Sequence, residues 1–534
     1  MKNKIIGTFV MILFVTTAFI PFFESNTEAK VTYGEEILNE NANWVVMFYQ
    51  NGDNALSNYI DICLDLIEEV GATDNVKIAV LIDKLPINDT KLYYYEGINA
   101  IEQDWPAESD MSDPETLIQF VEKVKTDLPS NHYCLEITAN KGSGWQGLSY
   151  DENGDLIMMT MPEIYYAFDT ITENGCYKLD VLLIQSCLGG NLEFRYQVRQ
   201  FVNYYVGYAD CGILGDIPFD DILADVVANP SMNGEQFAIN VVNHFVPQQI
   251  QNIYQAMGTT DSLELDELAG SIDELAVWLI DNIDIYESDI TTALGETRKY
   301  GLQFNIDYFI DLKDFLEHLN IADSNYITIK NSVLNNIEEA VIANVTLEGY
   351  PSCGFNFYYP NIKEDYNSAL RYDHALPSPY EETLFAEDTN WDEFIKIYLD
   401  LEDNTAPAEP SIDGNTQGNP GKEYDYILSA DDPQGDYICF YIEWGDDTFD
   451  WTNLDLSGEE ITVSHVWEEK GTYTVRVKAI DKYCASSDWG TLEVKMPVNQ
   501  PIQYYSFPLI QKILDMFPNA FPMLRLLFDG RTMD

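Results

Sequence analysis

The chain has 534 residues, of which 46% are hydrophobic and 13% aromatic, and 90 acidic against 28 basic residues give it a formal net charge of −62. This length and hydrophobicity allow two or three folded domains and exclude a chain that is disordered throughout. The negative charge repels nucleic acid and anionic lipid headgroups, so we expect no nucleic-acid partner and favour basic peptides, basic proteins and cations.

The N-terminal 29 residues have the features of an export signal. MKNK provides a basic start, an apolar run extends to Phe23, and small residues precede a cleavage position after Ala29. We therefore predict that residues 1–29 are a signal peptide and that the protein is secreted or located at the cell surface. The alternative is that the apolar run remains as a membrane anchor, but Pro21 favours a signal peptide.

Residues 43–401 alternate apolar runs with amphipathic segments. Strands are expected at Trp44–Tyr49, Val76–Asp83, Leu92–Glu96, Tyr133–Ala139, Val181–Gln185, Tyr204–Ala209 and, later, Gly354–Tyr359. Helices are expected at Ile60–Val70, Pro114–Leu128, Pro162–Ile171, Leu192–Val202, Gly234–Val246, Leu263–Ile283, Tyr308–Leu319 and Thr328–Ile342. This order predicts an α/β domain with a parallel sheet covered on both faces.

The last 130 or so residues differ in composition from the preceding domain. Residues 402–420 are rich in Pro, Gly, Asn and Asp, which predicts a linker. Residues 421–498 contain short alternating strands separated by turns, which predicts a small β-sandwich. Its sequences WGDD, HVW and GTYTVRVKAID resemble a PKD domain of the immunoglobulin-like class.

Residues 499–534 contain two apolar segments that are too short to cross a membrane. They either dock to a cell-surface component, together with the β-sandwich, or pack against the protein's own core. The periodicity of these segments is compatible with both arrangements.

Two polar loops follow strands of the predicted sheet. YCLEITANKGSGW places Lys141 after one strand, and VLLIQSCLGGNLE places Cys187 after the next. Since ligands bind at the carboxyl ends of the strands in open α/β sheets, we expect the functional site at these loops.

The ordered segments WVVMFYQNGDNAL, ANKGSGW, SCLGGNLE, CGFNFYYP and NWDEFIKIYL resemble the clostripain-like (C11) cysteine peptidases over residues 43–401. The resemblance implies a caspase-like fold in which a histidine and a cysteine on adjacent strand ends cut peptide bonds after basic residues. It places Cys187 at the nucleophile position and Lys141 at the histidine of an N-H-G-S-G-W loop. Gln185 and Ser186 stand where the family tends to have Asp-Ala.

Lys141 is a poor replacement for the histidine base. A thiol with a pKa near 8.5 needs a proton acceptor, and the pKa of lysine would have to fall by roughly three units for it to serve. An acidic protein opposes that fall. His132 begins the same strand about 25–30 Å away, and the four remaining histidines, His244, His318, His374 and His465, are expected in packing or solvated positions.

Three hypotheses follow from this sequence. The first is an exported, catalytically impaired clostripain-like protein that binds basic peptides, and the second is an active cysteine endopeptidase that uses Cys187 with an unusual partner. The third is a structural cell-surface protein. For the acidic pocket residue that the family's arginine preference implies, the candidates are Asp210 and Asp216, although the abundance of acidic residues favours surface charge for both.

Calcium is a candidate cofactor, with no other metal or cofactor expected. The acidic loops Asp431-Asp432 and Gly445-Asp446-Asp447 cluster oxygen ligands, and the resemblance implies a family that is often calcium-dependent. The eight cysteines form no CxxC pair, so we expect no zinc site and mostly buried free thiols. Cys439 and Cys484 lie in the same small C-terminal domain and could pair.

Overall fold

The computed structural model of the protein describes residues 41–57, 60–139, 144–151, 153, 158–212, 216–250, 253–302, 306–366, 380–401, 404–446, 448–483 and 485–496. The predicted signal peptide, the apolar segment at residues 499–534, and Lys141, His374, Asp447 and Cys484 lie outside the described residues. Within them, no helix combines the length and hydropathy needed to cross a bilayer.

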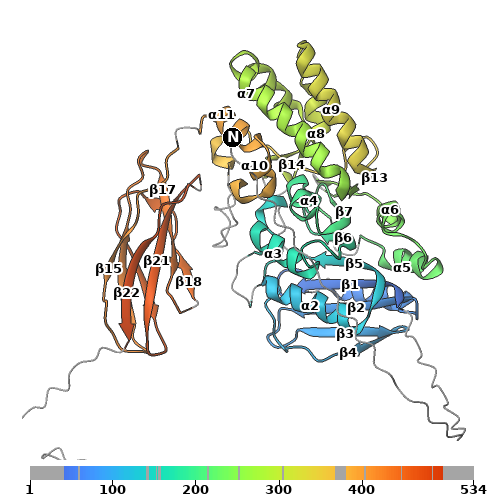
Figure 1. Ribbon diagram of the computed structural model, residues 1–534, viewed down its shortest axis with the longest axis horizontal. Helices are drawn as coiled ribbons and strands as arrows, with labels where there is room; N and C mark the ends of the chain where they lie inside the picture. Colours follow the sequence, from blue (N-terminus) through green and yellow to red (C-terminus); the bar gives the residue numbers. More distant parts are fainter. Residues whose placement is uncertain are drawn as a thin grey trace, which may run out of the picture. The chain divides into compact units, whose positions relative to one another are not determined.

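A nine-stranded sheet organises the first domain (Figure 1). Its strands are, in spatial order, β13 (Val341–Thr346), β10 (Ala256–Asp261), β7 (Val202–Tyr208), β6 (Leu179–Gln185), β5 (Ser130–Thr138), β1 (Ala42–Gly52), β2 (Val76–Lys84), β3 (Lys91–Glu96) and β4 (Asn99–Glu102). The five strands from β7 to β2 are parallel, which confirms the predicted parallel sheet.

The outer strands of this sheet are antiparallel, which the alternation of strands and helices did not predict. Only residues 85–90 separate β2 from β3. So short a connection can form a hairpin but cannot make the crossover that parallel neighbours require.

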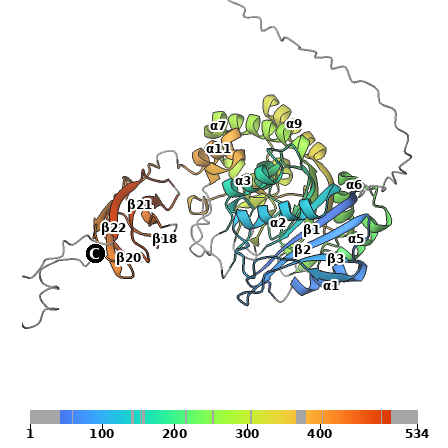
Figure 2. The same ribbon diagram turned by 60° about the horizontal axis from the view of Figure 1, so that its bottom comes forward.

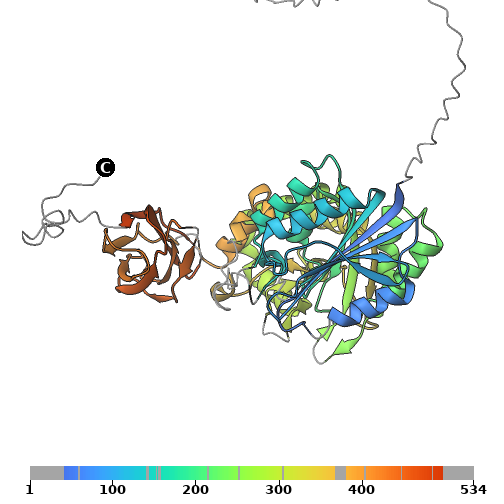
Figure 3. The ribbon, with the colours of Figure 1, turned by 90° about the horizontal axis from the view of Figure 1, so that it is seen from below.

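Helices cover both faces of the sheet, as Figures 2 and 3 show. On one face lie α2 (Pro114–Asp127), α3 (Met161–Ile171) and α4 (Leu192–Val198), and on the other α1 (Ile60–Val70), α5 (Phe219–Ala228) and α6 (Gly234–His244). Neighbouring residues of β5 alternate between the two cores, with Leu135 in the first and Cys134 in the second. This burial explains why the central strands are apolar along their whole length.

The later part of the domain is mainly helical. Its elements are a hairpin of β8 (Gln249–Ile250) and β9 (Ile253–Tyr254), the helices α7 (Leu265–Glu296), α8 (Leu312–His318), α9 (Ser324–Ala340), α10 (Leu384–Asp388) and α11 (Trp391–Tyr398), and a small sheet of β11 (Lys299–Tyr300), β12 (Phe309–Ile310) and β14 (Phe357–Tyr358). The helix expected from Tyr308 instead begins at Leu312, because Asp311 caps it by accepting from the Asp314 amide at 3.0 Å.

Two antiparallel sheets form the C-terminal region. One contains β15 (Ser411–Gly414), β16 (Glu423–Ser429) and β20 (Ile461–Val466), and the other β17 (Tyr437–Glu443), β18 (Phe449–Trp451), β19 (Asp455–Leu456), β21 (Gly471–Asp481) and β22 (Gly490–Met496). β15 falls in the range predicted as a linker. These residues form a strand because their backbone pairs with β16. Cys439 carries a free, buried thiol, so the disulfide considered for it is not formed.

Candidate functional site

The two loops that the sequence singles out leave the sheet side by side. Thr138 of β5 pairs with Gln185 of β6, and the Ala139 amide donates to the Gln185 carbonyl at 3.4 Å. Cys187 is two residues beyond Gln185, and the loop that contains Lys141 begins directly after Ala139. The parallel register therefore brings the start of both loops to one edge of the sheet.

The far ends of the two loops also meet. Gly144, the first described residue after the Lys141 loop, has a positive φ of 65°. A Cβ on Gly144 would lie 3.1 Å from the side chain of Asn191, which follows the Cys187 loop. The close approach and the backbone conformation both favour glycine at this position.

A tight turn presents Cys187. Its side chain is half-buried, and the next residue, Leu188, has a left-handed φ of 58°. The Leu188 amide donates to the Asp210 carbonyl at 3.0 Å, and the Gly190 amide donates to the Tyr208 carbonyl at 2.7 Å. The turn is thus fastened to the end of β7 by its backbone, and this support sustains the unusual conformation of Leu188.

A distant segment, Cys353–Tyr359, supports the same turn. The Asn356 side-chain amide donates to the carbonyls of Leu188 and Ala209, both at 3.0 Å, and its oxygen accepts from Asn191 Nδ2 at 3.0 Å. Asn191 in turn caps α4 by accepting from the Phe194 amide at 3.0 Å. These contacts join the turn, the start of α4 and the late segment into one buried polar unit.

The side chains of Arg195 and Glu193, both on α4, are completely buried. Arg195 donates to Gly190 O (3.2 Å), Tyr205 O (3.4 Å), Thr260 Oγ1 (3.0 Å), Gly258 O (3.2 Å) and Gly354 O (3.1 Å). Burial lowers the pKa of Arg195 to about 10. Glu193 accepts from the Tyr358 amide at 3.0 Å and the Tyr380 hydroxyl at 3.2 Å, and burial raises the pKa of its carboxyl to about 7.

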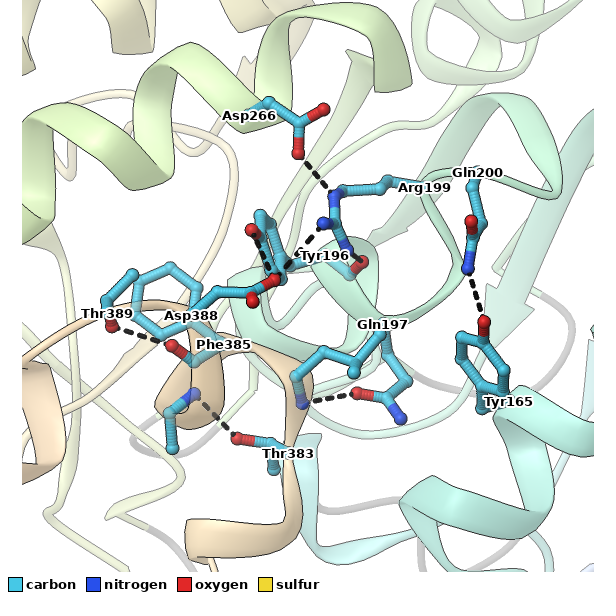
Figure 4. Close-up of polar contacts among 12 residues, drawn as sticks. Tyr165, Tyr196, Gln197, Arg199, Gln200, Asp266, Thr383, Phe385, Asp388 and Thr389 are labelled. Atoms are coloured by element: carbon cyan, nitrogen blue, oxygen red, sulfur yellow. Dashed lines mark hydrogen bonds and ion pairs between the residues drawn. The ribbon is translucent and has the colours of Figure 1, made fainter. Parts of the chain in front are cut away.

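The C-terminal end of α4 is anchored through Arg199 (Figure 4). Its guanidinium stacks on the Tyr196 ring, 3.5 Å from the centroid, and contacts Asp266 at 2.6 Å and Asp388 at 3.3 Å. Asp388 also accepts from the Tyr196 hydroxyl at 2.9 Å. These contacts tie α4 to the start of α7 and to α10, so both ends of the helix behind Cys187 are fixed.

A buried polar network lies on the strands beneath Cys187. Thr138 Oγ1 is 2.6 Å from Glu136 Oε1 and 3.0 Å from Gln185 Oε1, and Gln50 Nε2 donates to the other oxygen of Glu136. Burial raises the pKa of Glu136 to about 8. The floor under the turn is therefore polar, and Glu136 is protonated through most of the neutral range.

The described histidines are all held by other partners. Their contacts are His132 Nδ1 to Asp180 Oδ1 (2.9 Å), His244 Nε2 to Asp225 Oδ2 (2.8 Å), His318 Nδ1 to the Asp314 carbonyl (2.8 Å) and His465 Nε2 to Asp446 Oδ2 (2.8 Å). His132 pairs with Trp44 near the amino end of β5, as expected, and its ring stacks on the Trp44 indole. None of these four rings makes a hydrogen bond to Cys187.

Asp210 and Asp216 both have protein partners. Asp210 is buried and accepts from the amides of Cys211 (3.0 Å) and Gly301 (3.1 Å). Asp216 accepts from the Tyr208 hydroxyl and from Gln255 Nε2 at 2.7 Å. These contacts account for both carboxylates without a ligand, and a role for either residue in a substrate pocket stays a prediction.

The acidic loops of the β-sandwich use their carboxylates in turns. Asp432 Oδ1 accepts from the amides of Gln434 at 2.9 Å and Asp436 at 3.0 Å, and Asp446 Oδ1 accepts from Thr448. Over the described residues, the one group of three metal-ligand side chains lies elsewhere, in the first domain. Calcium binding at these loops stays a prediction.

Sequence reasoning missed Glu193, Arg195 and Asn356 as parts of the site. Each is a polar residue flanked by aromatic or aliphatic residues in NLEFRYQV or CGFNFYYP. A charged residue within an apolar helix is rarely buried without a partner, so this pattern was the available signal.

Comparisons with known proteins agree with this architecture. A sequence model described as the clostripain family (peptidase C11) matches residues 48–398. Clostripain of Hathewaya histolytica is 27% identical over 252 residues, which cover 37% of this chain and 46% of that protein. The match therefore spans less than half the length of that clostripain.

Two solved structures cover the two regions of the chain. A secreted C11 cysteine protease from Bacteroides thetaiotaomicron is 14% identical with a TM-score of 0.50, covering 65% of this chain and 99% of that chain. The caspase-like fold is thereby confirmed. A PKD domain from an M14-like peptidase of a Thermoplasmatales archaeon is 49% identical, with a TM-score of 0.17, over 18% of this chain and 98% of that chain.

Proposed function

Because the chain belongs to the clostripain family of cysteine peptidases, we propose that it is an exported, catalytically impaired member that binds basic peptides without cutting them. The observation that carries this proposal is that β5 and β6 end side by side, while the sequence has Cys187 in the loop after β6 and Lys141, at the family's histidine position, in the loop after β5. The loop position at which a proton acceptor is needed has a side chain that is a cation at neutral pH.

The chemistry of peptide cleavage explains why this replacement matters. The attacking sulfur must first lose its proton, and the departing amine must then receive one. Histidine can do both near neutral pH, whereas a lysine ammonium can stabilise a thiolate but cannot accept its proton. The four described histidines are hydrogen-bonded to partners other than Cys187.

The binding part of the proposal depends on charge and on the Cys187 turn. A chain with a net charge of −62 attracts cationic peptides over a long range. In the Cys187 turn, Leu188 is left-handed and the backbone is hydrogen-bonded to the end of β7. We further propose that export places this site outside the cell and that the PKD-like sandwich and residues 499–534 tether it to surface components.

One observation favours a second candidate, an active endopeptidase that cleaves after basic residues with Cys187 as nucleophile. The turn holds a half-buried thiol at the sheet edge next to the left-handed Leu188. Such backbone strain costs stability and is found mainly at functional sites. In this reading, the ammonium of Lys141 stabilises the Cys187 thiolate, and another group takes the thiol proton and returns it to the leaving amine.

The two candidates differ in peptide turnover and in covalent labelling. We expect no hydrolysis of arginyl or lysyl fluorogenic peptides by the wild-type protein, and saturable binding of the same peptides by fluorescence anisotropy. Lys141→His is expected to raise hydrolysis by about 100-fold or more above the background, because a general base contributes that much. Lys141→His combined with Cys187→Ala is the matched control and should show no gain.

Hydrolysis by the wild-type protein that disappears in Cys187→Ala would favour the active endopeptidase. Covalent labelling of Cys187 by an arginyl acyloxymethyl ketone, at a rate comparable to that of the Lys141→His variant, would also favour the active endopeptidase. Absence of both turnover and peptide binding would leave only the structural role.

A further inference from the structure

Three aspartates meet inside the first domain at the carboxyl edge of the sheet. Asp53 directly follows β1, and Asp83 is the second-last residue of β2. Asp151 belongs to the segment after the short 3-10 helix Gly144–Gln146. Each offers one carboxylate oxygen, and these three oxygens lie within 4.8 Å of one another. All three residues are at most 1% exposed.

Two of the carboxylates are incompletely satisfied. Asp53 Oδ1 and Asp83 Oδ2 are buried and have no hydrogen-bond partner. The other oxygens of these residues accept from the Asn153 amide at 3.2 Å and from Thr90 Oγ1 at 2.7 Å. Among the described residues, no lysine or arginine contacts Asp53 or Asp83. Buried carboxylates of this kind require a cation or a proton, because an isolated buried charge is very costly.

We propose that Asp53, Asp83 and Asp151 bind a divalent cation, and that Ca²⁺ is the ion that fits. Carboxylate oxygens are the ligands that hard divalent cations prefer. Ca²⁺ binds oxygens at about 2.3–2.6 Å, so oxygens up to about 5 Å apart can share one ion. Mg²⁺, with bonds of about 2.0–2.1 Å, needs oxygens within about 4 Å and keeps several waters.

The surrounding charges support a cation here. The negative charge of Glu108 acts on Asp83, and that of Asp110 acts on Asp151. A cation would compensate these like charges. The neighbourhood is thus electrostatically prepared for a positive charge.

The cluster joins segments that are distant in sequence. The Asn153 amide donates to Asp53 and, at 3.0 Å, to Asp151, while the Met111 amide donates to Asp151 at 2.8 Å. Asn51 Nδ2 donates to Ser149 Oγ at 2.6 Å, beside the cluster. A bound ion would therefore fix the segment that follows the Lys141 loop against the ends of β1 and β2. This role is independent of whether Cys187 is reactive.

The test uses the full-length secreted protein, stripped with EGTA and then titrated with CaCl₂ or MgCl₂ at constant ionic strength. We expect one high-affinity Ca²⁺ site by isothermal titration calorimetry and a rise in Tm of about 3 °C or more at saturation. Hydrogen exchange should slow in peptides that contain Met111 and Asn153, whose amides donate to the cluster. Asp53→Asn combined with Asp83→Asn should abolish all three effects.

Asp65→Asn combined with Asp74→Asn is the matched control, because it removes the same charge from exposed positions and should keep the site. If the Asp53→Asn and Asp83→Asn variant fails to fold, the Ca²⁺ stoichiometry and the hydrogen-exchange pattern of the wild-type protein test the proposal by themselves. The proposal is overturned if calorimetry finds no high-affinity Ca²⁺ site, if protection falls elsewhere, or if a folded Asp53→Asn and Asp83→Asn variant responds like the control. A stronger response to Mg²⁺ than to Ca²⁺ would overturn the choice of ion.

Discussion

Glu136 illustrates how a single proton organises the floor of the site. Thr138 has one hydroxyl hydrogen, yet its oxygen lies within hydrogen-bond distance of both Glu136 Oε1 and Gln185 Oε1. A protonated Glu136 resolves this, because its O–H donates to Thr138, which is then free to donate to Gln185. Burial raises the pKa of Glu136 to about 8, so the carboxyl carries this proton at neutral pH.

This arrangement predicts a pH dependence of stability. Since the pKa of Glu136 is raised from 4.5 to about 8 on folding, its contribution destabilises the fold progressively as pH rises from about 4.5 to about 8. Glu136→Gln keeps the shape without the titration. We expect the variant to match the wild type at pH 5 and to exceed its unfolding free energy at pH 9 by up to about 4 kcal/mol.

The measurement for Glu136 is urea unfolding of both proteins across this pH range. Glu339→Gln on α9 changes an exposed carboxylate and should leave the pH profile unchanged. A Glu136→Gln variant with the same pH slope as the wild type would show that Glu136 does not carry the proton.

At the scale of elements, the Cys187 turn depends on the segment Cys353–Tyr359. The turn leaves the carbonyls of Leu188 and Ala209 inside the protein, where each needs a donor, and Asn356 supplies both. Arg195 reaches the same segment through the Gly354 carbonyl. The late segment therefore completes the hydrogen bonding of the nucleophile turn.

Asn356→Ala is expected to destabilise the domain and loosen the turn. It removes the donor to two buried carbonyls, which predicts a loss of about 2–3 kcal/mol in the unfolding free energy. Alkylation of Cys187 by iodoacetamide should become faster, because the turn opens more often. Asn336→Ala removes one exposed hydrogen bond on α9 and should change the unfolding free energy by less than about 0.5 kcal/mol. Equal effects of both variants would contradict this role of Asn356.

At the scale of the whole molecule, charge is the dominant property. The 28 basic residues offset fewer than a third of the 90 acidic ones, so most carboxylates have no cationic partner. The resulting self-repulsion opposes compact states and weakens as salt screens it.

Salt is therefore expected to stabilise the protein and to weaken its binding of basic peptides. Raising NaCl from about 0.02 M to about 0.5 M shortens the Debye length from about 20 Å to about 4 Å. We expect Tm to rise with NaCl while the Kd for an arginine-rich peptide increases at least 10-fold. Scanning fluorimetry and anisotropy measure the two effects, and KCl at equal ionic strength is the control. A peptide affinity that does not change with salt would argue against electrostatic attraction.

The sequence by itself determined the class of fold and the sheet edge at which the candidate site lies. Continuous apolar runs that alternate with amphipathic helices require a sheet buried on both faces, and parallel strands bring Cys187 and the Lys141 loop to one edge. The negative charge and the family resemblance of the ordered motifs also followed from the sequence alone. The expectation that His132 lies at the opposite edge followed from its place in the strand and was confirmed.

Only the tertiary structure decided how this site is supported. Asn356 contacts Leu188 across 168 residues of sequence, and Asn153 contacts Asp53 across 100. The antiparallel edge strands, the buried Arg195 and the aspartate cluster depend in the same way on which segments become neighbours. Periodicity reports which face of a single segment is buried, whereas a polar side chain finds its partner only when the order of the strands is fixed.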